Sequence, residues 1–241
     1  MSVKWQAFPD LHSTAKACAE HTAALLEKTL ASHALATLAV SGGSTPKLMF
    51  GHLAGLQLDW ERIHLFWVDE RAVPPTDPQS NFRMAEEALV NPAGIAAGNV
   101  HRVRAELPPQ EAAEKYVEEM RQFFGLREGE VPRFDVIQCG IGADSHTASL
   151  FPGAALIADR TRVAAAVYVE KFAQWRITLA PATLQAAKNH LFLVTGADKA
   201  EAVRNVLQKP YDPMHFPAQV VSNQSSNATW FLDEAAASGL K

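Results

Sequence analysis

One segment of the chain places an acid, a hydroxyl and an imidazole side by side, at Asp144, Ser145 and His146. A glycine-rich turn, GIG, connects these residues to an apolar run at 134–138 that is typical of a buried strand. In an open α/β sheet, ligands bind beyond the carboxyl ends of the strands. A titratable ring and a carboxylate at such a strand end indicate acid–base or binding chemistry, so we expect His146 to face a substrate.

Three further predicted strands also end in groups that could bind a ligand. SGGSTP at 41–46 offers backbone N–H groups, hydroxyls and a helix N-terminus, a combination that favours phosphate. In DER at 69–71 the guanidinium can grip a phosphate with two hydrogen bonds, while Glu70 should turn away from the ligand by strand alternation. TGADK at 195–199 adds a lysine. Each motif alone is weak, but together they predict one anion-binding pocket.

Several other kinds of site lack their sequence signatures. The chain has no GxxxxGK[ST] phosphate loop, no GxSxG serine elbow, and no HExxH or paired CxxC metal spacing. The GIGADS run fails the dinucleotide fingerprint, because Ser145 occupies the position of the third glycine. We therefore expect no metal and no cofactor.

The composition describes an ordinary globular protein of 241 residues, with 48% hydrophobic residues and a net charge of −4. This charge gives no overall attraction to nucleic acid or to an anionic membrane. Two isolated cysteines, and the lack of both a signal peptide and a long apolar run, favour a cytoplasmic location with reduced thiols. We expect a single domain over 1–241, as a monomer or a small homo-oligomer.

Apolar patterns place these motifs in an α/β chain, with strands alternating with helices. The alternation predicts an open, mostly parallel sheet with helices on both faces. The expected helices are 11–33, 46–53, 81–89, 109–124 and 198–207, and the expected strands are 35–40, 63–68, 99–103, 134–138, 163–169, 176–179, 190–195 and 229–232.

Taken in order, the motifs resemble the 6-phosphogluconolactonase family, in the superfamily of glucosamine-6-phosphate deaminase and ribose-5-phosphate isomerase. The resemblance runs nearly end to end, and its motifs are SGGSTP, WVDERAVP, SNFRMAEEAL, GIGADSHTASLFPG, RITLA and LFLVTGADKA. It implies a modified Rossmann-like fold and metal-free hydrolysis of 6-phospho-D-glucono-1,5-lactone. The family usually reads Asp-Gly-His where this chain has Ser145, and a positive φ there would strain the serine by about 1 kcal/mol or more.

The resemblance also implies roles for the acid–base groups. His146 would be the general base that activates water, a task that suits an imidazole because its unperturbed pKa is about 6.5. Either Asp69 or Asp144 would orient the ring, and the sequence leaves this choice open.

For substrate binding, the resemblance and the strand ends together indicate a phosphate near the loop that contains Gly42, Gly43, Ser44 and Thr45. Arg71 and Lys199 would be its cationic partners. Arg176 is a second candidate for the phosphate or an oxyanion, and Asn81 for the sugar hydroxyls.

Two alternatives share the same expected fold. The first is a sugar-phosphate isomerase or deaminase, and the second is a non-catalytic sugar-phosphate sensor. The deaminase branch usually reads HIAFNEPG where this chain reads HTASLFPG, so its functional glutamate corresponds to Phe151. The lactonase is favoured because ring opening and amine transfer would lose an acid–base group.

Overall fold

The computed structural model describes residues 4–222 and 227–240, and its central feature is a parallel sheet of seven strands. The prediction of a mostly parallel α/β sheet is thus confirmed. In spatial order the strands are β1 (Lys4–Phe8), β10 (Ala228–Asp233), β9 (Asn189–Val194), β6 (Val136–Cys139), β2 (Ala36–Val40), β3 (Ile63–Trp67) and β5 (Val100–His101).

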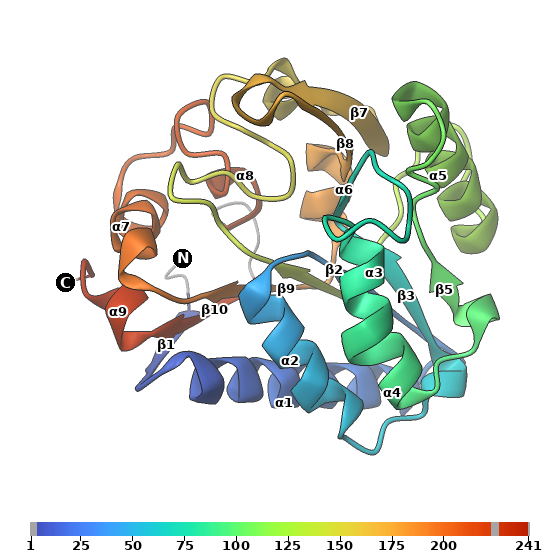
Figure 1. Ribbon diagram of the computed structural model, residues 1–241, viewed down its shortest axis with the longest axis horizontal. Coiled ribbons are helices and arrows are strands. Elements are labelled where there is room, and N and C mark those ends of the chain that lie inside the picture. The colour runs from blue at the N-terminus through green and yellow to red at the C-terminus, as the bar shows by residue number, and fades with distance from the viewer. Residues whose placement is uncertain (1–3, 223–226, 241) are drawn as a thin grey trace.

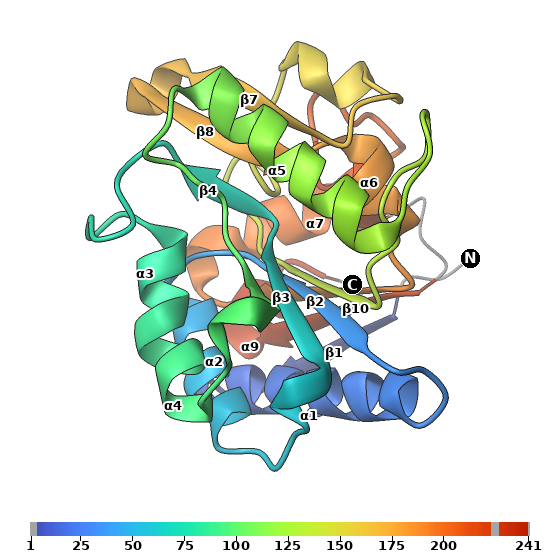
Figure 2. The same ribbon diagram turned by 90° about the vertical axis from the view of Figure 1, so that its right-hand side faces the viewer.

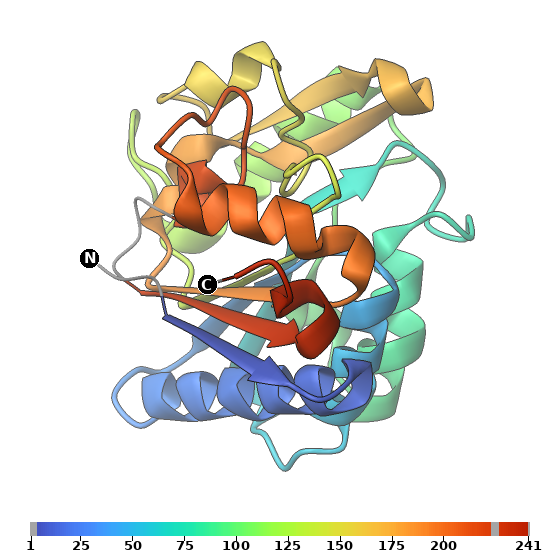
Figure 3. The ribbon, with the colours of Figure 1, turned by 90° about the vertical axis from the view of Figure 1, so that its left-hand side faces the viewer.

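Helices cover the sheet on both sides (Figures 1 and 3). α1 (Leu11–Leu30) begins at Asp10, whose carboxylate accepts a hydrogen bond from the Ser13 backbone N–H at 2.8 Å, and it packs along one face beside α2. The remaining α-helices are α2 (Ser44–Ala54), α3 (Asn81–Ala85), α4 (Asn91–Ala93), α5 (Pro109–Phe124), α6 (Pro181–Ala186), α7 (Ala200–Gln208), α8 (Gln219–Ser222) and α9 (Glu234–Ala237). No helix among the described residues is long and apolar enough to cross a membrane.

A second, antiparallel sheet lies above the first, and the sequence did not predict it. Its order is β4 (Asp69–Arg71), β8 (Gln174–Leu179) and β7 (Ala164–Val169), and α5 packs against it. The DER motif is therefore itself a strand, and not the tail of the preceding one. Figure 2 shows the chain leaving β3 and entering β4 beside β8.

Smaller differences concern element boundaries. The helix predicted at 81–89 is α3 followed by a π-helical turn, Glu86–Val90, while α5 has the predicted bounds. The first helix ends at Leu30 and not at residue 33. β1 was missed, because four of its five residues are exposed and it lacks an apolar pattern.

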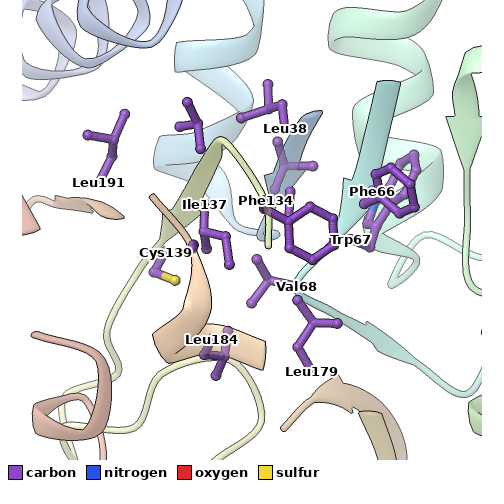
Figure 4. Close-up of a cluster of buried hydrophobic side chains, with 14 of the residues drawn as sticks. Leu38, Phe66, Trp67, Val68, Phe134, Ile137, Cys139, Leu179, Leu184 and Leu191 are labelled. Atoms are coloured by element: carbon purple, nitrogen blue, oxygen red, sulfur yellow. The ribbon is translucent and has the colours of Figure 1, made fainter. Parts of the chain in front are cut away.

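Buried side chains join the two sheets (Figure 4). Leu38, Phe66 and Ile137 come from the parallel sheet, and Leu179 from β8 packs in the same cluster. Cys139 is free and fully buried, and burial raises the pKa of its thiol to about 12, so it acts as a small apolar side chain.

The strand order explains how the site is assembled. β9, β6, β2 and β3 are four consecutive strands of one parallel sheet, so their carboxyl ends lie along the same edge. These are the strands that precede TGADK, GIGADSH, SGGSTP and DER. The fold therefore brings the segments that follow these four strands to one edge of the sheet.

Candidate active site

The imidazole of His146 is held by the carboxylate two residues before it. Nδ1 of His146 lies 2.5 Å from Oδ1 of Asp144, and the Lys171 ammonium donates to Oδ2 at 3.1 Å. The hydrogen bond from His146 is the largest of the effects that hold the pKa of Asp144 well below its ordinary value. Because an ionised carboxylate only accepts, Nδ1 carries the proton and Nε2 is the basic nitrogen of the ring.

The turn before His146 has to approach the ring very closely. A Cβ on Gly142 would lie 2.0 Å from Nδ1 of His146, so only glycine allows this arrangement. Ser145 is buried and has φ of 64°, the left-handed conformation that its glycine counterpart in the family would adopt without strain. Ser145 therefore has the strained backbone conformation that the family resemblance predicted for a serine at this place.

Phe151 forms the wall beside the imidazole. Its ring stacks on His146, with centroids 4.1 Å apart and an angle of 27° between the planes. The guanidinium of Arg176 lies 5.6 Å from the centroid of the same ring. An aromatic ring therefore stands next to the imidazole at the position where the deaminase branch would have a glutamate.

Asp69 lines the same cavity as His146, but its carboxylate is hydrogen-bonded to other residues and not to the imidazole. Oδ2 accepts a hydrogen bond from Ser149 Oγ at 2.7 Å, and the Asp69 carbonyl accepts one from Asn81 Nδ2 at 2.8 Å. Of the two carboxylates left open by the sequence, Asp144 is thus the one bonded to the ring.

Glu70 is a residue whose role the sequence did not reveal. It is 1% exposed and does not line the cavity, as strand alternation predicted. Its carboxylate accepts hydrogen bonds from the backbone N–H groups of Arg71, Asn81 and Phe82 and from the Ser80 hydroxyl. Burial raises the pKa of Glu70, and these four donors oppose the rise. Glu70 thereby fixes the start of α3 and the backbone that carries Asn81.

Two neighbouring cavities could hold a ligand. The smaller, of about 110 Å³, is lined by His146, Asp69 and Arg176, among others. The larger, of about 360 Å³, is lined by Gly43, Ser44 and Lys47, among others. Arg71 and Asn81 line both, so the two cavities meet at these side chains.

The glycine loop shapes this junction. A Cβ on Gly42 would lie 1.8 Å from the Asn81 side chain, and Gly43 precedes α2 with φ of 125°. The backbone N–H groups at the start of α2 are therefore accessible to an anion in the larger cavity. Lys47, in the first turn of α2, also lines this cavity, although it lies one residue beyond the SGGSTP motif and was not among the predicted binding residues.

Two predicted binding residues are not brought into either cavity. The Thr45 hydroxyl lies 2.8 Å from the Thr195 hydroxyl, so its side chain links the first turn of α2 to the residue after β9 instead of facing a ligand. The Lys199 ammonium lies 3.2 Å from the Asp198 carboxylate. Among residues 4–222 and 227–240, no group of three or more His, Cys, Asp or Glu side chains is arranged to hold a metal ion.

Comparison with known proteins identifies the family of this chain. The family described as glucosamine-6-phosphate isomerases/6-phosphogluconolactonase matches residues 9–230. The chain is 36% identical over 219 residues to the 6-phosphogluconolactonase of Synechocystis sp. (90% of this chain and 89% of the relative), and 35% identical over 205 residues to that of Haemophilus influenzae (83% and 85%). The solved structure of 6-phosphogluconolactonase from Trypanosoma brucei has a TM-score of 0.89 at 26% identity, covering 100% of this chain and 99% of that one. With most of its length matched, the chain belongs to the glucosamine-6-phosphate isomerase/6-phosphogluconolactonase family.

Proposed function

We propose that this chain hydrolyses 6-phospho-D-glucono-1,5-lactone to 6-phospho-D-gluconate, the second step of the oxidative pentose phosphate pathway. The observation that carries the proposal is the His146 ring, held by Asp144 in a cavity that also contains two guanidinium groups. Relatives named 6-phosphogluconolactonase support the same activity.

In the proposed mechanism, Nε2 of His146 removes a proton from water as the water oxygen attacks the lactone carbonyl carbon. Asp144 holds the ring in the required tautomer and stabilises the imidazolium that forms. The imidazolium then returns the proton to the ring oxygen as its bond to the carbonyl carbon breaks. Water thus supplies the hydroxyl of the new carboxylic acid and the proton on the released ring oxygen, and the acid then loses its own proton to solvent to give the gluconate.

The substrate phosphate is proposed to lie in the larger cavity, against the backbone of Gly43 and Ser44 and beside Arg71. Lys47 is proposed as the second cation in place of Lys199, because Lys47 lines this cavity and Lys199 does not; the Glu87 carboxylate, 3.8 Å from the Lys47 ammonium, lines it as well. Asn81 lies where the two cavities meet, a position suited to the sugar hydroxyls.

The competing chemistry is amine release or isomerisation of a sugar phosphate. Phe151, stacked on His146, has no acid–base group for ring opening, which favours hydrolysis. A sensor would bind phosphogluconate without turning over the lactone.

A coupled assay separates these functions. Lactone hydrolysis above the spontaneous rate supports the proposal, whereas ammonia release from glucosamine 6-phosphate or binding without turnover contradicts it. We expect Asp144→Asn to lower kcat by about 10³-fold or more, because the asparagine amide no longer fixes the ring tautomer. Asp159→Asn is the control, since this carboxylate lies in an exposed turn with Thr161 and Arg162.

A further inference from the structure

Two arginines face each other across the second sheet. Arg71 on β4 and Arg176 on β8 are direct partners in the antiparallel register, so their side chains project from the same face. Both line the cavity that contains His146. Like charges directly opposite each other destabilise a sheet. A negative charge between or beside the two guanidinium groups would therefore relieve their repulsion.

The protein itself supplies only part of that charge in the cavity. Asp69 projects from the same face of β4 as Arg71, and its Oδ2 lies 3.9 Å from the guanidinium of Arg176. The same oxygen already accepts a hydrogen bond from Ser149. One carboxylate against two guanidinium groups leaves one positive charge for a ligand.

Arg176 is built into the wall and keeps hydrogen-bonding capacity. It is 8% exposed, and its guanidinium lies beside two aromatic rings, 5.0 Å from the centroid of Phe172 and 5.6 Å from that of Phe151. Its Nε, like that of Arg71, is buried and has no hydrogen-bond partner among the residues that the structure describes. Burial lowers the pKa of this guanidinium and the Asp69 carboxylate opposes the change, so Arg176 remains a desolvated cation.

The surroundings of the two arginines differ. Arg71 lines both cavities, and one of its terminal nitrogens donates to the Gln79 carbonyl at 2.5 Å. Arg176 lines only the smaller of these two cavities, with the imidazole. A ligand with its reacting carbon near His146 and its phosphate in the larger cavity could contact Arg176 only at its reacting end, whereas Arg71 also borders the cavity of its phosphate.

We propose that the two arginines divide the charged ends of the substrate: Arg176 binds the lactone carbonyl oxygen as it becomes an oxyanion, and Arg71 binds the phosphate. This inference rests on the proposed lactone hydrolysis and deepens it. When water attacks, the carbonyl π electrons move to the carbonyl oxygen, and the Arg176 guanidinium donates to the resulting anion. When the intermediate collapses, that oxygen becomes part of the product carboxylate, and the ring oxygen leaves with the proton from His146.

The test compares two substrates, 6-phospho-D-glucono-1,5-lactone and the same lactone without its phosphate. We expect Arg176→Gln to lower kcat by about 10²- to 10³-fold on both, since an oxyanion donor acts on either carbonyl. Arg71→Gln should raise KM on the phosphorylated lactone and leave kcat/KM on the other nearly unchanged. Arg176→Lys should be faster than Arg176→Gln, because lysine keeps the positive charge. It should remain slower than the wild type, because it lacks the planar guanidinium and its paired donors. Arg133→Gln, an exposed site, is the control.

An Arg176→Gln deficit confined to the phosphorylated lactone would make Arg176 a phosphate ligand and overturn the inference. Equal losses of both variants on both substrates would also overturn it. Thermal unfolding of each variant identifies any that fails to fold, and in that case Arg176→Lys or the matching Arg71→Lys takes its place in the same comparison. If the wild type does not turn over the lactone, the proposed function fails separately. Titration with inorganic phosphate then decides the division: Arg71→Gln must weaken binding and Arg176→Gln must not.

Discussion

Replacing Gly142 by alanine tests how the turn positions the catalytic ring. The new Cβ would lie 2.0 Å from Nδ1 of His146 and 2.6 Å from Oδ1 of Asp144, whereas ordinary van der Waals contact begins at 3.4 Å. The ring would have to move by the difference between 3.4 and 2.0 Å, about 1.4 Å. Such a movement breaks the 2.5 Å contact between the imidazole and the carboxylate.

The expected loss follows from the geometry. A misplacement of about 1 Å can cost on the order of 10²-fold in rate, which corresponds to about 2.7 kcal/mol in the activation free energy. The fold should persist, because Gly142 does not have the positive φ that would exclude alanine. We therefore expect kcat for lactone hydrolysis to fall by about two orders of magnitude in a protein that still unfolds cooperatively.

The matched control is Gly140→Ala in the same GIG turn. Its Cβ would meet only the Leu193 carbonyl oxygen, at an ordinary 3.8 Å, so kcat should change far less. Steady-state kinetics and thermal unfolding of both variants measure the difference. The reasoning is refuted if Gly142→Ala keeps the wild-type kcat, or if both alanines reduce kcat equally while the proteins remain folded.

Three further predictions concern backbone strain, the support behind the site and a buried histidine. Ser145→Gly should raise the free energy of unfolding by about 0.5–1 kcal/mol, because glycine removes the left-handed strain at the cost of some chain entropy; Ser145→Ala, which keeps a Cβ, should show no gain in urea unfolding. Glu70→Gln should destabilise the fold by about 3 kcal/mol, because both carboxylate oxygens accept hydrogen bonds and the amide NH2 of glutamine would point at one of these N–H donors. The displaced start of α3 should also raise KM through Asn81, and an unchanged urea midpoint would contradict the prediction. Burial lowers the pKa of His190, so the unfolded chain binds its proton more readily, and the free energy of unfolding should fall as the pH drops below about 6.5; His190→Gln should flatten that slope between pH 7.5 and 5.5, and an equal slope in both proteins would count against it.

Sequence reasoning succeeded where structure depends on local signals. α5 begins at a proline and ends before Gly125 in the left-handed conformation, and its bounds were predicted correctly. The second sheet was missed for the opposite reason: β4 has three residues, too few to show a period, and its partner β8 lies about a hundred residues further along the chain. The sequence left the choice between Asp69 and Asp144 open, because it depends on side-chain directions that are set by the packing of the two sheets.

The short strand β4 explains why the DER motif has this order of residues. Alternation places Asp69 and Arg71 on the face that lines the cavity, and Glu70 on the opposite face. There the glutamate binds backbone N–H groups at the start of α3, so one three-residue strand supplies cavity groups and also fixes the helix that carries Asn81. An insertion of one residue in this strand would exchange the two faces and place Glu70 in the cavity. Arg176 on β8, which is now opposite Arg71, would then face the Glu70 carboxylate in place of an anionic ligand, so the register of β4 against β8 determines whether the cavity can bind an anion.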